Sequence, residues 1–285
     1  LRDYTTTYSE GNKCIYGEEA RIFLHKLFTR SADHFQSVAE YPLHQCRTEP
    51  FPYQREGVRF LASRTAAMLA DDVGLGKTYQ AGAAALAIDA QRVLWVTTAP
   101  AKEGVRADLL EHFSIPESEV LVITDAHPTL RSAQINNLST ERFVITNYET
   151  LVALKSRRPA EYEKLTKDID VLILDEAQRA DNPRSLRSQA ITSLHATRRW
   201  ILSATPYQNR YENLWTILNQ IAPDQFPNRN GFKDTYTKTT DGLVRLHTVL
   251  SDMMLRRTKE ETISLFQDPK AESFDTQLRT RSPRV

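Results

Sequence analysis

The chain has 285 residues, of which 40% are hydrophobic and 26% are charged. This composition is ordinary for a folded, soluble protein, and the length predicts roughly two domains. Lys and Arg number 37 against 36 Asp and Glu, which gives a net charge of +1. This net charge does not argue for nucleic-acid binding, and it does not exclude a basic patch on one part of the surface. No apolar run approaches the ~20 residues that a membrane-spanning helix needs, and we expect no membrane partner.

The two cysteines, Cys14 and Cys46, lie far apart and form no CxxC pair. Neither a zinc ribbon nor a disulfide framework is therefore predicted. His44 lies close to Cys46, but two ligands do not make a structural zinc site. No signal peptide is evident, and we expect a reduced, intracellular protein, nuclear or cytoplasmic according to its source.

The pattern along the chain divides it into three parts. Residues 1–48 begin polar and continue into an amphipathic stretch at 18–39, which predicts an N-terminal helical extension. Residues 49–262 form the main domain, and 263–285 read as a polar tail or linker. Within the main domain we expect a loop at 223–242 and a helix at 243–254.

Short apolar runs alternate with amphipathic segments through the main domain. The runs predicted as buried strands are 67–70, 93–97, 120–123, 143–146, 171–174 and 200–202. The helices predicted around them are 55–64, 78–90, 102–112 and 186–194. Alternating strands and helices indicate an α/β fold with a parallel sheet covered on both faces. Such sheets bind ligands at the carboxyl ends of their strands.

The first strand runs into the sequence DDVGLGKT at 71–78, and a helix follows. Gly74 and Gly76 would let backbone N–H groups approach phosphate oxygens, next to a helix N-terminus that favours anions. Lys77 would contact the β- and γ-phosphates, and the Thr78 hydroxyl would bind Mg²⁺. The pattern predicts a phosphate-binding loop, although Asp71 stands where the strict motif has glycine.

The strand at 171–174 ends in Asp175 and Glu176. Asp175 would hold Mg²⁺ and Glu176 would deprotonate the attacking water, which are the two acidic roles that nucleoside triphosphate hydrolysis requires. The strand at 200–202 ends in Ser203, Ala204 and Thr205, whose hydroxyls could hydrogen-bond the acidic loop. These small residues are commonplace at strand ends and carry little weight alone.

Six segments together resemble the first RecA-like lobe of the Swi/Snf family of superfamily-two ATPases. In chain order they are FPYQREGVRFL, LADDVGLGKT, VITNYETL, LILDEAQRADNP, ILSATPYQNRYENLW and MLRRTKEE, which span residues 51–261. Asp71 replaces the first loop glycine as it does in this family, and the TPYQNRYENLW and LRRTKEE segments distinguish the chain from DEAD-box RNA helicases.

The resemblance implies ATP and Mg²⁺ as cofactors and gives each site residue a role. The implied ATP-binding residues are Gln54, Asp72, Gly74, Leu75, Gly76, Lys77, Thr78 and Tyr79, with Gln54 reading adenine. The implied catalytic residues are Lys77, Asp175, Glu176 and Gln178, and the implied metal ligands are Thr78 and Asp175. Coupling between the ATP site and the DNA surface is implied for Gln178, Ser203, Ala204 and Thr205.

The resemblance also implies two partners, double-stranded DNA and a second RecA-like lobe, for which too few residues follow Glu261. The residues implied to line the DNA track are Pro100, Lys102, Thr146, Asn147, Tyr148, Gln208 and Asn209. Basic side chains that could contact DNA phosphates are Lys102, Arg106, Arg184, Arg187 and Arg210, each of which could equally be a solvated surface charge.

Three other functions stay open from the sequence. One is the motor of a restriction or phage DNA-processing system, which Gln178 in place of the usual histidine slightly favours. Another is a nucleotide-binding interaction module without catalysis, against which the intact Lys77, Thr78, Asp175 and Glu176 argue. The third is an RNA helicase.

Overall fold

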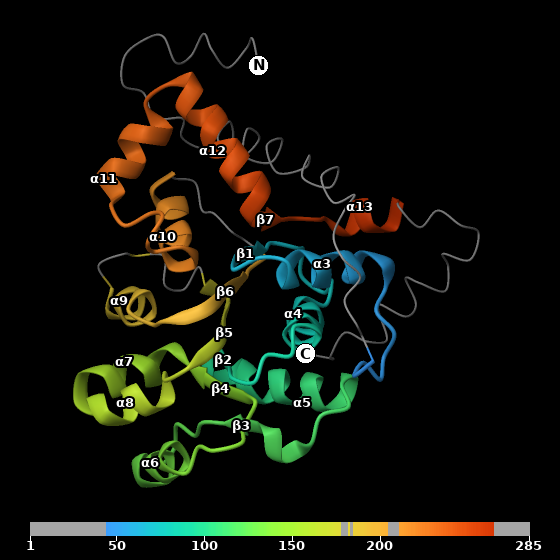
Figure 1. Ribbon diagram of the computed structural model, residues 1–285, viewed down its shortest axis with the longest axis vertical. Helices are drawn as coiled ribbons and strands as arrows, with labels where there is room; N and C mark the ends of the chain where they lie inside the picture. Colours follow the sequence, from blue (N-terminus) through green and yellow to red (C-terminus); the bar gives the residue numbers. More distant parts are fainter. Residues whose placement is uncertain (1–43, 178–181, 183–184, 205–210, 265–285) are drawn as a thin grey trace.

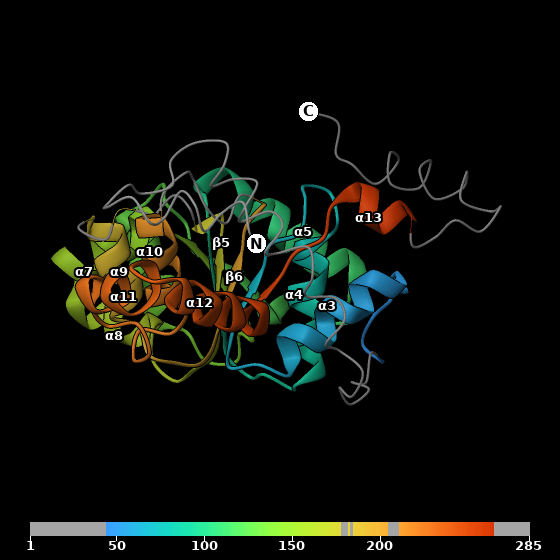
Figure 2. The same ribbon diagram turned by 90° about the horizontal axis from the view of Figure 1, so that it is seen from above.

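The computed structural model describes residues 44–177, 182, 185–204 and 211–264 (Figure 1). The helix predicted at 18–39 lies outside these residues, as does the tail predicted at 263–285 apart from its first two positions, which end helix α13 (Lys259–Ser264). Within the described part of the chain a single sheet runs through the molecule, with helices on both sides of it (Figures 1 and 2). None of the described helices is long and apolar enough to cross a membrane.

The sheet has seven strands in the order β3-β4-β2-β5-β6-β1-β7, and each pair of neighbours is parallel. The strands are β1 (Ala66–Leu69), β2 (Val93–Thr97), β3 (Val120–Val122), β4 (Phe143–Asn147), β5 (Ile169–Asp175), β6 (Ala196–Leu202) and β7 (Met254–Leu255). The first six agree with the strands predicted from apolar runs. The short β7 was missed because two residues give no periodic pattern.

Successive side chains of each strand enter opposite hydrophobic cores, as the pleat requires. In β2, Trp95 packs with the helices of one face and Leu94 with those of the other. The first face is covered by α3 (Pro52–Ala62), α4 (Lys77–Ala87) and α5 (Lys102–His112). Helices on the second face include α6 (Pro128–Asn136), α7 (Tyr148–Arg157), α8 (Pro159–Leu165), α9 (Leu186–Thr192), α10 (Tyr211–Ile221) and α12 (Thr240–Met253). The predicted RecA-like α/β fold is confirmed.

The loop predicted at 223–242 is wrong over most of its length. The structure has helix α11 (Arg229–Phe232), a π-helical turn η5 (Lys233–Thr237) and the start of α12. Two of the polar residues that suggested a loop are helix caps: the Asn228 side chain accepts from the N–H groups of Asn230 and Gly231, and the Thr239 side chain accepts from the Gly242 N–H. Phe232 lies between Phe226 and Tyr236, with ring centroids 6.1 and 5.2 Å away, and this aromatic cluster packs the segment against the lobe.

A single carboxylate joins the starts of two central strands. Asp170 in β5 accepts hydrogen bonds from the backbone N–H groups of Gln91 and Arg92, at 2.7 and 2.9 Å. These bonds hold the turn before β2 against β5.

We expect Asp170→Ala to lower the free energy of unfolding by about 1–3 kcal/mol, because it leaves these N–H groups without their acceptor. Asp170→Asn keeps an acceptor oxygen and should lose less. Urea unfolding followed by circular dichroism measures both variants, and equal stability of Asp170→Ala and wild type would contradict the assignment.

Candidate active site

Three strands end side by side at one edge of the sheet, and each delivers a motif there. The Ser203 N–H donates to the Leu69 carbonyl (3.2 Å), which joins the end of β6 to the end of β1. The Glu176 N–H donates to the Leu202 carbonyl (2.9 Å), which joins the end of β5 to β6. The phosphate loop, the acidic pair and the segment beginning at Ser203 therefore meet at this edge, as the sequence predicted.

The phosphate loop, residues 71–76, has the backbone conformation that its glycines predict. Gly74 and Gly76 have φ angles of +86° and +72°, in the left-handed region that favours glycine. Gly76 is also the residue before α4, so the eleven-residue helix points its N-terminal N–H groups into the loop. Leu75 is fully buried and anchors the loop to the core.

Lys77 is held on the loop itself. Its Nζ donates to the carbonyl oxygens of Asp71 (2.7 Å) and Asp72 (3.1 Å). Burial lowers the pKa of Lys77, while the charges of Asp71, Glu176, Asp175 and Asp72 oppose that shift. The Lys77 ammonium is therefore already partly removed from water. Bound phosphate oxygens would replace the carbonyl oxygens of Asp71 and Asp72 as its acceptors.

Asp175 is fixed through both its side chain and its backbone. The Thr97 hydroxyl donates to Asp175 Oδ2 (2.9 Å), and the Tyr148 hydroxyl donates to the Asp175 carbonyl (2.7 Å). Burial and, to a smaller extent, the Glu176 charge raise the pKa of Asp175 to about 6, against the lowering effect of the Thr97 hydrogen bond. Glu176 has a φ of +54°, a strained value for a residue with a side chain.

Gln54 lies next to the phosphate loop. Its Oε1 accepts from the Phe51 N–H (3.0 Å), and its Nε2 donates to the Leu75 carbonyl (3.4 Å). A Cβ on Gly76 would come within 2.5 Å of Gln54 Nε2, so the loop and the amide are in close approach. Tyr79 faces away from this contact, because its hydroxyl donates to the Thr48 carbonyl (2.6 Å).

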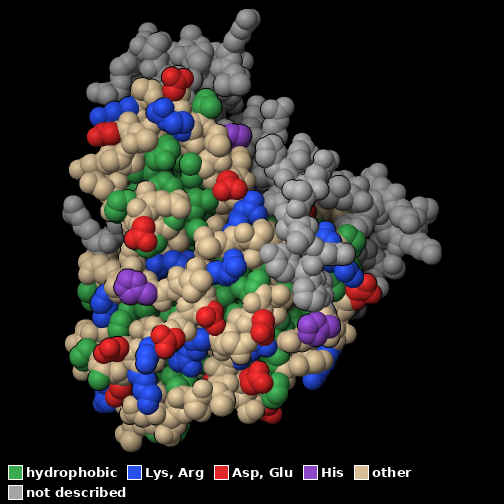
Figure 3. Space-filling model, viewed as in Figure 1, with side chains coloured by type: hydrophobic (Ala, Val, Ile, Leu, Met, Phe, Trp, Pro, Cys, Tyr) green, Lys and Arg blue, Asp and Glu red, His purple; other side chains and the backbone are tan. Residues whose placement is uncertain are grey.

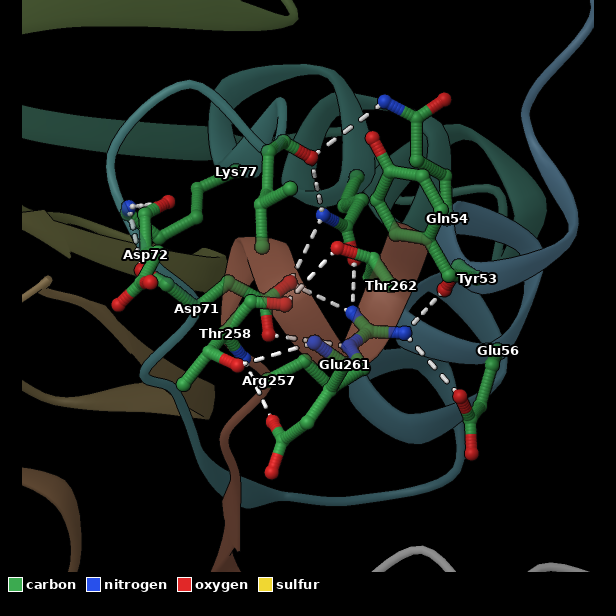
Figure 4. Close-up of polar contacts among 12 residues, drawn as sticks. Tyr53, Gln54, Glu56, Asp71, Asp72, Lys77, Arg257, Thr258, Glu261 and Thr262 are labelled. Carbon is green, nitrogen blue, oxygen red and sulfur yellow. Dashed lines mark hydrogen bonds and ion pairs between the residues drawn. The ribbon is translucent and has the colours of Figure 1, made fainter. Parts of the chain in front are cut away.

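A buried ion pair lies beneath the phosphate loop, and sequence reasoning missed its second member (Figure 4). Arg257 binds Asp71 through two hydrogen bonds, Nε to Oδ1 at 3.0 Å and Nη2 to Oδ2 at 2.6 Å. The side chains of Arg257 and Asp71 are only 5% and 0% exposed. Asp71 is therefore a structural residue of the loop, and its partner lies 186 residues further along the chain.

The same guanidinium binds three other groups. Nη1 donates to the Tyr53 carbonyl and to Glu56 Oε2, and Nη2 donates to Gln80 Oε1 (2.8 Å). All five N–H donors of Arg257 are thus used. Gln80 in turn donates from Nε2 to Asp71 Oδ2 (3.1 Å) and to the Leu75 carbonyl (3.0 Å).

Gly57 in α3 makes room for this network. A Cβ at position 57 would lie 1.7 Å from Gln80 Oε1 and 3.0 Å from Arg257 Nη2. The glycine is needed here for space, because α3 and α4 approach each other closely at this point.

The chemistry of the site suits Mg²⁺ bound together with a nucleotide. Asp175 and Thr78 would offer a carboxylate and a hydroxyl oxygen, and oxygen donors are the ligands that Mg²⁺ prefers. Among the described residues no group of three or more His, Cys, Asp or Glu could hold a metal ion. Mg²⁺ is usually bound through one or two protein groups and the phosphates of a substrate.

Part of the predicted coupling segment can be described. Ser203 is buried, and Ala204 follows it at the edge of the sheet. Gln178 and Thr205 lie outside the described residues, as do Gln208, Asn209, Arg184 and Arg210. Their predicted roles stay predictions.

The predicted DNA-track residues that the structure describes are largely buried. Lys102 is 5% exposed, and its Nζ donates to the Ile123 carbonyl (2.7 Å) and to Asp125 Oδ2 (2.6 Å). Thr146, Asn147 and Tyr148 are at most 2% exposed. In this conformation these side chains support the edge of the sheet, and Tyr148 links it to Asp175.

Asp125 was not singled out from the sequence, yet it joins two of the predicted track segments. Its carboxylate accepts from Lys102 Nζ, Asn147 Nδ2 (2.9 Å) and the Thr150 hydroxyl (2.9 Å). Asn147 also caps α7 by accepting from the Thr150 N–H. No spacing rule identifies such a residue, because its partners lie on two segments far from it and from each other in the sequence.

The remaining candidates for DNA contact are at the surface. Pro100 is exposed in the short helix η2 (Ala99–Ala101). Arg106 pairs with Glu117, and Arg187 pairs with Glu149 at 2.6 Å. On the face drawn in Figure 3, basic and acidic side chains are interspersed. The balanced charge of the chain thus extends to this face.

Comparisons with known proteins identify the family of the chain. A family model described as the SNF2-related domain matches residues 53–279. The chromatin-remodeling ATPase INO80 of Arabidopsis thaliana is 29% identical over 74% of this chain and 16% of its own length. The ISWI chromatin-remodeling complex ATPase ISW1 of Saccharomyces cerevisiae is 29% identical over 74% of this chain and 19% of its own length.

Solved structures have the same fold. The SWI2/SNF2 ATPase core of Sulfolobus solfataricus in complex with dsDNA superposes with a TM-score of 0.63 at 24% identity, covering 79% of this chain and 47% of that one. The SWI2/SNF2 ATPase core domain of Sulfolobus solfataricus gives a TM-score of 0.64 at 22% identity, covering 82% of this chain and 48% of that one. The chain thus spans less than a fifth of those two remodellers and about half of the solved cores.

The parallel sheet covered by helices on both faces gives the chain the RecA-like fold of these solved cores. The family match then fixes its membership: the chain belongs to the SNF2-related family and is a first ATPase lobe of the Swi/Snf type.

The raised pKa of Asp175 predicts how stability changes with pH. The pKa in the folded chain is about 6, above the ordinary value of 3.8, so the ionised carboxylate is less favourable folded than unfolded. Folding stability from this group is therefore highest at low pH and falls as the pH rises from about 4 through 6.

Asp175→Asn removes the partly buried charge and keeps an oxygen to accept from Thr97. We expect the variant to melt at a higher temperature than wild type at pH 8 without Mg²⁺, with the difference shrinking toward pH 4. Calorimetry across this pH range measures it, and a variant that is less stable at pH 8 would contradict the burial of a charge at this position.

Proposed function

We propose that this chain is the first ATPase lobe of an ATP-driven motor that moves along double-stranded DNA. The observation that carries the proposal is the meeting of the phosphate loop with Asp175 and Glu176 at one edge of the sheet. The Ser203–Leu69 and Glu176–Leu202 backbone hydrogen bonds bring these strand ends together, and the charges of both acidic residues oppose the lowering of the Lys77 pKa.

ATP would bind with its phosphates in the loop and its adenine beside Gln54. Lys77 would exchange the carbonyl groups of Asp71 and Asp72 for phosphate oxygens, and the N-terminus of α4 would add backbone N–H donors. The amide of Gln54 can both donate to and accept from the edge of adenine. Its close approach to Gly76 supports a base bound next to the phosphate loop.

Hydrolysis would need a base and an oriented carboxylate. Glu176 would take a proton from the attacking water, and its strained backbone supports a functional constraint at this position. Thr97 and Tyr148 hold Asp175 so that its carboxylate and the Thr78 hydroxyl could bind Mg²⁺, which neutralises charge on the phosphates.

Efficient turnover would require the second lobe. Arginines supplied to a phosphoryl-transfer site from another domain are worth roughly 10³–10⁵ in rate. The coverage of half of the solved cores supports a partner lobe in the whole protein. The chain by itself should then bind ATP weakly and hydrolyse it very slowly.

Contact with DNA would be made mainly through phosphates, which gives affinity with little sequence selectivity. The complex of the archaeal SWI2/SNF2 core with dsDNA supports duplex DNA as the partner. The exposed candidates on the described surface are Pro100, Arg106 and Arg187.

Lys77→Ala should weaken ATP binding by this chain by about 2 kcal/mol, or roughly thirtyfold in Kd, because a charge-assisted contact to phosphate is lost. Isothermal titration with Mg²⁺ and ATP measures the affinity. Lys233→Ala removes an exposed lysine of η5 and serves as the matched control. Equal affinity of the Lys77 variant and wild type would refute the site.

In the protein that includes its second lobe, Glu176→Gln should leave ATP binding intact and abolish turnover stimulated by duplex DNA. Stimulation of the wild type should fall steeply as salt rises, because counterions are released on binding. Normal hydrolysis by the Glu176 variant would show that another residue is the base.

The same assay separates the other functions. Stimulation by RNA above duplex DNA would indicate an RNA helicase, and ATP binding without any turnover in the longer protein would indicate an interaction module. A nuclease that copurifies with the longer protein would indicate a restriction or phage system.

A further inference from the structure

We propose that Arg257 is a positioning residue of the ATP site, through which the segment after β7 holds the phosphate loop in its binding conformation. The inference rests on the proposed function, because it concerns the same nucleotide site. It assigns a role to a part of the chain that contributes none of the groups expected to touch ATP.

Backbone pairing first brings the segment to the loop. The Ala70 N–H donates to the Leu255 carbonyl (2.7 Å), and the Asp72 N–H donates to the Arg257 carbonyl (3.0 Å). The Lys259 N–H then donates to the Asp72 carboxylate (3.2 Å). The β1–β7 pairing thus continues past the end of both strands, into the first half of the phosphate loop.

Helix α13 (Lys259–Ser264) keeps the segment in this register. Its first turn is closed by a reciprocal cap, in which Thr258 N–H donates to Glu261 Oε2 (2.7 Å) and Glu261 N–H donates to Thr258 Oγ1 (3.1 Å). Arg257 therefore enters the loop from a backbone that is fixed on both sides.

The guanidinium supports the loop from below at both ends. At the start it binds the Asp71 carboxylate, while the Asp71 carbonyl holds Lys77. Further along it orients Gln80, whose amide donates to the Leu75 carbonyl. Two short chains of hydrogen bonds thus connect Arg257 to the groups that would contact phosphate.

Arg257 is also connected to Gln54, the residue expected to contact adenine. Arg257 donates to the Tyr53 carbonyl, one residue before Gln54, and Gln54 shares the Leu75 carbonyl with Gln80. Displacing Arg257 would therefore disturb the loop and the adenine-reading glutamine together. By linkage, ATP and the docked segment stabilise each other.

A purely structural role is the alternative, because buried ion pairs can be replaced by apolar groups with little loss of stability. The two roles separate in a double variant. Arg257→Met alone leaves the buried Asp71 charge uncompensated and should lower the melting temperature. Asp71→Asn with Arg257→Met removes both charges and should recover most of that loss.

For the double variant, we expect ATP affinity to stay roughly tenfold or more below wild type although stability is recovered, because groups that orient a binding residue typically contribute 10–100-fold. Isothermal titration with Mg²⁺ and ATP provides the readout. Arg257→Lys keeps the charge but not the fork-shaped donor set, and should also lose affinity. Wild-type affinity in the double variant would overturn the proposal.

Arg199→Met is the matched control. Arg199 is another buried arginine, in β6, and donates to the carbonyl groups of Ile191 and Leu194. This variant should lower the melting temperature and leave ATP affinity unchanged at temperatures where it is folded. An equal loss of affinity in this control would mean that general destabilisation explains the effect, and would overturn the proposal.

A measurement on the unmodified chain guards against variants that do not fold. Saturating ATP with Mg²⁺ should slow deuterium exchange of the backbone amides in 255–262, and exchange unchanged by ATP would overturn the coupling. If ATP does not bind to wild type at all, the proposed function fails. If ATP binds through Lys77 but is insensitive to Arg257, only this inference fails.

Discussion

A carboxylate without exposure to water must be neutralised, and much of this lobe is arranged to neutralise Asp71. The side chain lies at the start of the phosphate loop, where many nucleotide-binding proteins have glycine. Asp71 binds the guanidinium of Arg257, which is distant from it in sequence. The same guanidinium donates hydrogen bonds to Gln80 and to the carbonyl of Tyr53. The pairing of β7 with β1 places Arg257 beside Asp71, so the support of the loop and the edge of the sheet belong to one structure.

The sheet could be predicted from the sequence because its strands are buried on both faces. Continuous apolar runs such as 93–97 and 171–174 allow few other structures, and their parallel order follows from the helices between them. The region after residue 222 could not be predicted in the same way. Its helices are short, and Asn228 and Thr239 serve there as caps, although the same residue types are equally common in loops.

The residues of the candidate site also fall into two groups, those that could be predicted from the sequence and those that could not. Gly74, Gly76, Lys77 and the Asp175-Glu176 pair could be found because each motif is contiguous and its chemistry depends on residue type. Arg257 and Asp125 could not, because their roles arise from partners that are distant in sequence. Burial also changed the interpretation of Lys102 and Asn147, whose polar groups are satisfied inside the lobe in this conformation.

Gly57 has a consequence for which sequences this fold tolerates. Glycine in the middle of a helix lowers helix stability by about 1 kcal/mol relative to alanine. On helix propensity alone, alanine would therefore be preferred at position 57. Here even a methyl group would collide with Gln80 and push it away from both Asp71 and Leu75. A position that binds no ligand and bears no charge is thus constrained by a side chain on the neighbouring helix.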